Sequence, residues 1–230
     1  SYDGGGISLY YSNASINECI ISNNTGNSGG GIWAIHSDFT INNSSVTGSN
    51  GSGLYISNTT ATVSDIMVEN NWTSGNGAGF YVSSSDLILS NVLIAGNDAV
   101  APSAGGMSIS GGNTSLINVT ITDNSCGNNS PYGSGGGIAI GQTSTLSLLN
   151  TIVFNNTYDQ ILSGYDQAQI SISYSNIQGG QDGIVPYSEG DYVNLTWGDG
   201  NIDADPLFCN ADSSDFTLYD NSPCVGTGQD

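Results

Sequence analysis

The sequence contains no lysine and no arginine, although it holds 20 aspartate and glutamate residues and carries a formal net charge of −20. A groove that binds nucleic acid needs basic side chains to neutralise phosphates, so the composition excludes that class of protein. It also argues against docking on anionic membrane surfaces, which attract basic segments. Because only 9% of the residues are charged, we interpret the surface as rich in hydroxyls and amides rather than as salt-adapted.

Cysteine and histidine are also scarce. The four cysteines form no Cys-x-x-Cys pair and the only histidine is His36, so a zinc site is not expected. Cys209 and Cys224 bracket a short tail and are predicted to form a disulfide, which requires an oxidising compartment. No signal peptide, lipidation motif or membrane-spanning hydrophobic run is present. The chain begins directly on a repeat, which indicates a processed or excised piece of a secreted protein.

The dominant feature that is present is a repeat, with a glycine followed by an apolar residue at the start of each unit. Gly135-Gly136-Gly137-Ile138 is one such start. The apolar residues at the starts are Ile7, Ile32, Leu54, Phe80, Met107 and Ile138. A polar residue between two apolar ones recurs in the same units, at Glu18, Asn43, Asp65, Asn91, Asn118 and Asn150. A third polar position follows six residues later, at Asn24, Ser49, Asn71, Asn97, Asn124 and Asn156.

Three short β-type segments in each unit, joined by turns, predict one coil of a parallel β-helix. Alternation directs every second side chain inward, and the coils stack because no single coil can bury its own apolar face. We therefore predict an all-β solenoid of about seven coils over residues 1–180, followed by a C-terminal capping segment over residues 181–230. Asn43, Asp65, Asn91, Asn118 and Asn150 are interpreted as a structural ladder, because stacked asparagines hydrogen-bond along the stack and tolerate left-handed backbone.

The units resemble those of right-handed parallel β-helix repeat proteins, within the pectate-lyase-like superfamily. More narrowly, they resemble the Gly-Gly-Gly-Ile and Asn-x-x-Ile-x-x-Asn repeats of large surface proteins, and are similar to the repeats of polymorphic outer-membrane proteins. The tail from Gly200 to Phe208, with Ser222-Pro223-Cys224, resembles the segment that closes such repeats. This fold hosts lyases, hydrolases, adhesins and inert stalks, so the resemblance implies a fold and leaves the function open.

The resemblance also bears on catalysis. The lyases of that superfamily depend on arginine or lysine, and this chain has neither. The related hydrolases carry an Asp-Asp pair and a His-Gly pair, whereas this chain has no Asp-Asp and His36 is followed by Ser37. We therefore predict no catalytic residues and no enzymatic activity.

Two further site predictions come from short motifs. Asn-x-Ser/Thr triplets mark glycosylation acceptors, although a chain this rich in Asn, Ser and Thr also forms such triplets by chance. The candidate acceptors are Asn13, Asn23, Asn58, Asn71, Asn113, Asn128, Asn155 and Asn194. Asp199, Asn201, Asp203 and Asp205 place oxygen ligands at alternate positions, as the start of a calcium loop does. The alternative for these four is turn capping by Asp and Asn side chains.

These observations favour a secreted, non-enzymatic structural or adhesive protein, a glycosylated stalk or filament subunit that stacks end to end. Self-association or neighbouring domains of a larger surface protein are the expected partners, together with glycans, and calcium is the one candidate cofactor. The alternative is a polysaccharide-binding or polysaccharide-cleaving module, similar to glycoside hydrolases. An acidic cleft with aromatic walls would favour that alternative, and Tyr10, Tyr11, Trp33, Tyr55, Trp72 and Tyr81 are the aromatic candidates.

Overall fold

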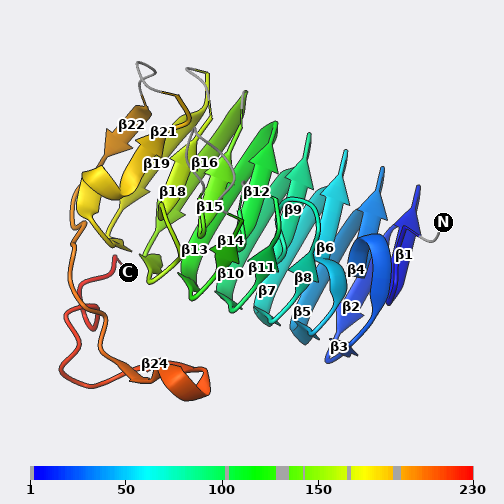
Figure 1. The fold of residues 1–230 in the computed structure, drawn as a ribbon, viewed down its shortest axis with the longest axis horizontal. Coiled ribbons are helices and arrows are strands. Elements are labelled where there is room, and N and C mark those ends of the chain that lie inside the picture. Colours follow the sequence, from blue (N-terminus) through cyan, green and yellow to red (C-terminus); the bar gives the residue numbers. More distant parts are fainter. Residues whose placement is uncertain are drawn as a thin grey trace.

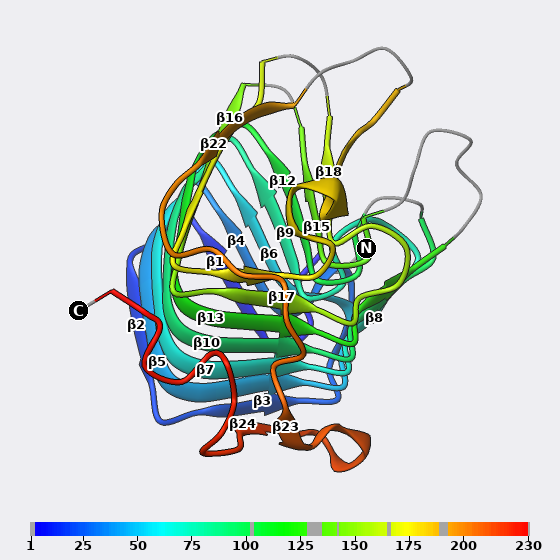
Figure 2. The same ribbon diagram turned by 90° about the vertical axis from the view of Figure 1, so that its left-hand side faces the viewer.

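The chain winds into a parallel β-helix whose coils stack along one axis (Figure 1). The structure is a computed structural model that describes residues 3–101, 104–127, 135–141, 143–164, 167–188 and 193–229. Each coil has three sides, which we call the first, second and third faces, and the view along the axis shows them enclosing the core (Figure 2). The all-β solenoid of about seven coils predicted from the sequence is confirmed.

The faces are built by strands that pair in parallel from coil to coil. The first face consists of β1 (Ile7–Tyr10), β4 (Thr25–Ile35), β6 (Asn50–Ser57), β9 (Phe80–Ser83), β12 (Met107–Ser110), β15 (Ile138–Ile140), β18 (Ile161–Ser163) and β21 (Ile184–Pro186). The second face consists of β2 (Ala14–Asn17), β5 (Asp38–Thr47), β7 (Thr60–Glu69), β10 (Asp86–Ala95), β13 (Gly112–Thr122), β16 (Ser144–Leu149), β19 (Gln169–Ser173) and β22 (Asn194–Trp197).

The third face continues some of the same strands around a corner. It is formed by β3 (Ile20–Ser22), the second halves of β5, β7, β10 and β13, β17 (Ile152–Phe154) and β20 (Asn176–Ile177). Short strands extend the first face at β8 (Trp72–Thr73), β11 (Asp98–Ala99) and β14 (Ser125–Cys126). The remaining elements are the 3₁₀ turns η1 (Gly180–Gly183) and η2 (Ala211–Ser213) and the antiparallel hairpin of β23 (Phe208–Asn210) and β24 (Asp215–Leu218).

The core consists of columns of apolar side chains, one column for each face. On the first face the apolar residues that begin the repeats stand in register from Ile7 to Ile184, and those from Ile32 to Ile161 are fully buried. The apolar residues that flank the recurring polar position form the columns of the second and third faces, as Leu89 and Ile94 do. Inward alternation therefore produces one continuous core.

Each coil turns its corners through residues with left-handed backbone, which explains the abundance of asparagine and glycine. The predicted ladder residues have φ angles between 45° at Asn43 and 54° at Asn91 and Asn118. A second corner has the same conformation at Asn23, Gly48, Asn70 and Gly96, and the third has it at His36 and Asn58. Asparagine and glycine adopt this region at lower cost than other residues, so the repeat composition follows from the corners.

The predicted boundary at residue 180 is wrong, because β21 and β22 continue the parallel sheets past it. Val193, Leu195 and Trp197 then pack against the core as part of an eighth, incomplete coil. The repeat signal ended early because the ladder position is a tyrosine, Tyr174, in the seventh coil.

The tail does not simply cover the last coil, as the sequence-based prediction had it. It turns back along the side of the rod, and Figures 1 and 2 show the β23–β24 hairpin beside the third face. The backbone N–H of Gln229 donates to Asn150 Oδ1 at 2.8 Å, and Asn150 Nδ2 donates to the Gln229 carbonyl at 2.9 Å. These two bonds hold the end of the tail on the sixth coil.

The predicted disulfide between Cys209 and Cys224 is also wrong, because all four cysteines are free thiols. Cys209 lies in the hairpin, where its carbonyl accepts a hydrogen bond from the Tyr219 hydroxyl at 3.1 Å. The Cys224 sulfur instead faces the rod and accepts a hydrogen bond from Asn176 Nδ2 at 3.2 Å. The tail is therefore fastened to the rod by hydrogen bonds rather than closed by a covalent bridge.

Candidate functional site

Two polar ladders run along the rod, and they differ in exposure. The outer ladder is the one predicted from the sequence. Its side chains are linked by hydrogen bonds from Asn91 Nδ2 to Asp65 Oδ1 at 3.0 Å, from Asn118 to Asn91 at 3.1 Å and from Asn150 to Asn118 at 3.1 Å. Asn43 donates instead to Asn17 Oδ1, at 3.4 Å. These side chains lie at the surface, so each bond contributes little net free energy.

The inner ladder occupies the third polar register, and its side chains are buried. Asn71 Nδ2 donates to Asn97 Oδ1 at 3.0 Å, Asn97 to Asn124 at 2.9 Å and Asn124 to Asn156 at 2.9 Å. Gln160 accepts the last bond of the series, from Asn156 at 2.9 Å. The same amides also bond to backbone groups of the neighbouring coils, as Asn97 Nδ2 does with the Val68 carbonyl at 2.9 Å. The inner ladder therefore satisfies buried backbone groups at one corner of every coil that it crosses.

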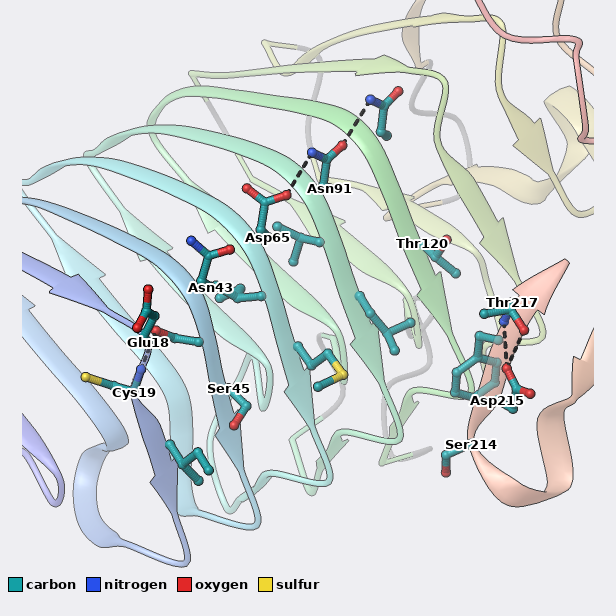
Figure 3. A pocket seen from close by; sticks show the side chains of 18 residues that line it. Glu18, Cys19, Asn43, Ser45, Asp65, Asn91, Thr120, Ser214, Asp215 and Thr217 are labelled. Atoms are coloured by element: carbon teal, nitrogen blue, oxygen red, sulfur yellow. Dashed lines mark hydrogen bonds between the residues drawn. The ribbon is translucent and has the colours of Figure 1, made fainter.

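A groove of about 850 Å³ lies between the third face and the hairpin of the tail (Figure 3). One column of outward side chains forms part of its floor, with Ile20, Ser45, Met67, Leu93 and Thr120 in register on successive coils. The outer ladder from Glu18 to Asn118 forms one rim, and residues 214–217 of the hairpin form a wall at the end of the groove near Thr120 (Figure 3). Sequence analysis did not identify this groove, although the residue two places after each ladder position marks its floor.

The described fold and the family comparison agree. A family model described as a right-handed β-helix region matches residues 1–118. The chain belongs to the right-handed β-helix family. No curated protein and no solved structure matches the chain. No helix among the described residues has the length and apolar character to pass through a bilayer.

The β-helix places the candidate glycosylation sites in different environments. Asn13, Asn23, Asn58, Asn113, Asn155 and Asn194 are exposed. Asn71 is 1% exposed and its amide belongs to the inner ladder, so the prediction of an acceptor at this residue is wrong. Asn128 lies outside the described residues. Some of the exposed acceptors are hydrogen-bonded, for example Asn113 Nδ2 to Asp86 at 2.8 Å and Asn155 Nδ2 to Asp123.

The β-helix does not gather the candidate calcium ligands. Asn201 Oδ1 accepts from the Ser175 N–H at 3.0 Å, and its Nδ2 donates to the Ile172 carbonyl at 2.9 Å. Asp203 accepts from the Gly179 N–H and Asp205 from the Leu207 N–H, at 3.0 and 2.9 Å. Among the described residues, Asp199, Asp203 and Asp205 do not come together as a group that could hold an ion. The geometry favours the alternative of turn capping for these residues.

The aromatic candidates gather on the first face of the β-helix, near its first coils. Tyr55 and Tyr81 stack with ring centroids 4.6 Å apart and planes 10° apart. Tyr11 stacks on His36 in the same way, at 4.8 Å and 18°. Rings in such stacks cover one another's faces, so these four side chains pack along the rod axis. Trp72, on β8, is 42% exposed and stands apart from these stacks, in register with Asn50 and Asp98.

Because Glu69 is half-buried, we expect the folding stability of the β-helix to depend on pH. It lies on the third face in register with Thr47 and Ala95, and burial raises the pKa of its carboxyl. Between the ordinary pKa of about 4.3 and the raised value, the folded state binds more protons than the unfolded state. Stability contributed by this group is therefore lost as pH rises through that window.

We expect Glu69→Gln to be more stable than the parent chain at pH 7, with the difference vanishing below about pH 4. The measurement is the urea midpoint of both chains at pH 3.5 and pH 7, followed by circular dichroism. Glu18→Gln is the control, because Glu18 lies exposed on the outer ladder. An equal gain in stability for both variants, or a gain that is already present at pH 3.5, would show that burial of Glu69 is not the cause.

Proposed function

We propose that this chain is a non-enzymatic structural or adhesive element of an extracellular surface protein, in which the β-helix serves as a stiff stalk. The observation that carries the proposal is the inner ladder, whose buried amides link consecutive coils along the rod axis from Asn71 to Gln160. Tilting one coil against the next would break several of these bonds at once. Buried hydrogen bonds are costly to leave unmade, so the ladder resists bending.

The use of the acidic side chains supports the same role. Asp65 accepts from Asn91, Asp86 from Asn113 and Asp98 from Ser125, in each case from a residue 26 or 27 positions later in the sequence. Each of these carboxylates therefore joins one coil to the next. A stalk needs such axial connections, whereas a catalytic pair of carboxylates must converge on one bond of a substrate.

Electron microscopy and mass spectrometry of the same native sample test this proposal. We expect rods that join end to end or continue into neighbouring domains, and a mass above 23.6 kDa per chain because of attached sugars. Glycopeptides are expected at exposed acceptors such as Asn58 and none at Asn71. Chymotrypsin serves for digestion, since trypsin has no cleavage site. Isolated, unglycosylated monomers would contradict the proposal.

Polysaccharide binding is the second candidate, and exposed tyrosines at the first coil favour it. Tyr10 and Tyr11 are 59% and 68% exposed and meet edge to face at 4.5 Å. Trp33 lies 6.1 Å from Tyr10 in a stacked arrangement. Affinity electrophoresis in gels that contain neutral or acidic polysaccharides tests this candidate. Retardation that is lost in Tyr10→Ala but kept in Tyr219→Ala, a variant of a similarly exposed tail residue, would support sugar binding.

A further inference from the structure

Large apolar side chains in the groove beside the hairpin are exposed to solvent. Ile20 is 83% exposed and Met67 is 48% exposed, and both project from the same register column as Leu93. Phe216 also lines the groove and comes from β24 of the hairpin. Exposed apolar side chains that gather in one concave surface are typical of a binding site, whereas single exposed ones are not.

The charges around this apolar floor all have one sign. Glu18 and Asp65 stand on the ladder rim, and Asp215 stands on the hairpin wall. The Asp215 carboxylate accepts hydrogen bonds from the Thr217 hydroxyl and N–H, which lower its pKa. The chain has no lysine or arginine, so no side chain of that kind neutralises the rim. A bound group that carries positive charge would complement it.

The shape and composition restrict what can fill the groove. The floor column spans five coils from Ile20 to Thr120, which at about 4.8 Å per coil is about 19 Å. An extended peptide of about six residues covers that distance at about 3.3 Å per residue. A second copy of this chain cannot supply the complementary charge, because it also lacks lysine and arginine. A second copy of these residues is therefore excluded as the occupant.

We propose that the groove between the third face and the β23–β24 hairpin binds an extended segment of another protein in which lysine or arginine alternates with apolar residues. The apolar side chains contact Met67, Leu93 and Phe216, and the basic side chains face Glu18, Asp65 and Asp215. This inference does not depend on the proposed stalk role, because it requires the groove and its charge alone.

Fluorescence anisotropy with labelled hexapeptides tests the inference on the intact chain. The probe is acetyl-(Lys-Leu)₃-amide, compared with acetyl-(Glu-Leu)₃-amide and acetyl-(Lys-Ser)₃-amide. We expect the first peptide to bind most tightly, with an affinity that falls between 20 and 200 mM salt as screening increases. The Lys-Ser peptide measures general attraction to the net charge of −20. Equal binding of the Lys-Leu and Lys-Ser peptides would overturn the inference.

Matched variants locate the binding surface. We expect Met67→Lys to abolish binding, and Ile88→Lys, an equally exposed residue of the second face at 49%, to leave it unchanged. Ile20→Lys provides a second groove variant in case Met67→Lys fails to fold. The double variant Glu18→Gln/Asp65→Asn removes two rim charges, and we expect about fivefold weaker binding from the loss of exposed ion pairs.

Asp182→Asn, at the exposed η1 turn, tests the loss of one negative charge away from the groove and should leave the affinity unchanged. Equal weakening by Asp182→Asn and by the rim variant, or by Ile88→Lys and Met67→Lys, would show that the peptide binds elsewhere. If the Glu-Leu peptide binds as tightly as the Lys-Leu peptide, the groove is an apolar surface that does not select for positive charge. That result would also overturn the inference.

Discussion

Replacing Asn97 with alanine is expected to lower the free energy of unfolding by about 4 kcal/mol, because it leaves several buried polar groups without partners. Asn97 is 0% exposed, and its Oδ1 accepts from both the backbone N–H and the Nδ2 of Asn71, at 3.1 and 3.0 Å. Its Nδ2 donates to the Val68 carbonyl. Alanine removes this acceptor and this donor together. Each buried group left without a partner costs about 1–3 kcal/mol. The backbone N–H and the Nδ2 group of Asn71 both lose their acceptor, and their combined cost gives the estimate.

Urea unfolding followed by circular dichroism measures this loss, and we also expect the thermal midpoint to fall by roughly 10 °C for a chain of this size. The control is Asn91→Gly in the same coil. Asn91 is exposed and has a φ of 54°, which glycine adopts without strain. We expect this variant to lose about 1 kcal/mol, the net value of exposed hydrogen bonds. Equal losses for the two variants would show that burial does not distinguish the inner ladder from the outer one.

Gly106→Ala is expected to destabilise the rod by about 3 kcal/mol, at the upper end of the usual cost of overpacking. A Cβ atom at this position would lie 2.5 Å from the carbonyl oxygen of Gly137 and 3.1 Å from the Ile121 Cγ2 atom. The first of these atoms belongs to the backbone of the next coil and cannot move aside by a change of rotamer. Relief of the contact would require the two coils to separate, which disrupts the parallel pairing of β12 with β15.

The matched control for Gly106 is Gly75→Ala. Gly75 lies in a turn where an added Cβ would meet only the Thr73 hydroxyl, at 3.6 Å. There the smaller conformational entropy of the unfolded chain should leave stability unchanged or raise it by about 0.5 kcal/mol. Chemical denaturation of both variants measures the difference. Similar stability for the two variants would mean that the backbones at Gly106 are not held close together.

The repeated glycine is a case in which a sequence-based interpretation and the structure agree on the reason. A glycine that recurs at one place in a repeat is typical of positive φ or of a close approach of two backbones. The structure assigns the second cause, since an added Cβ would lie 2.5–2.9 Å from a carbonyl oxygen of the next coil at Gly31, Gly53, Gly79 and Gly137 as well. Positive φ is the reason at other glycines, such as Gly48 and Gly96 at a corner.

The two asparagine registers show where sequence alone was insufficient. Asn91 and Asn97 have the same side chain and recur with the same period, yet Asn91 is exposed and Asn97 is 0% exposed. Their order in the repeat does not show which one turns into the rod. For that reason Asn71 was predicted as a glycan acceptor, although its amide bonds to the Val46 carbonyl within the rod. Burial here depends on the direction in which the chain leaves each corner.

The path of each coil can be derived from the sequence. The inward positions, the corner residues and the parallel stacking all follow from local rules, namely alternation along strands, left-handed tolerance of Asn and Gly, and the need of each coil to cover its apolar face. Long-range packing, in contrast, sets which polar register is buried, where the rod ends and how the tail returns. The bond between Asn150 and Gln229 joins residues 79 positions apart. The groove also forms only because the tail returns along the rod. This contact occurs once in the chain, so a repeat of about 25 residues does not predict it.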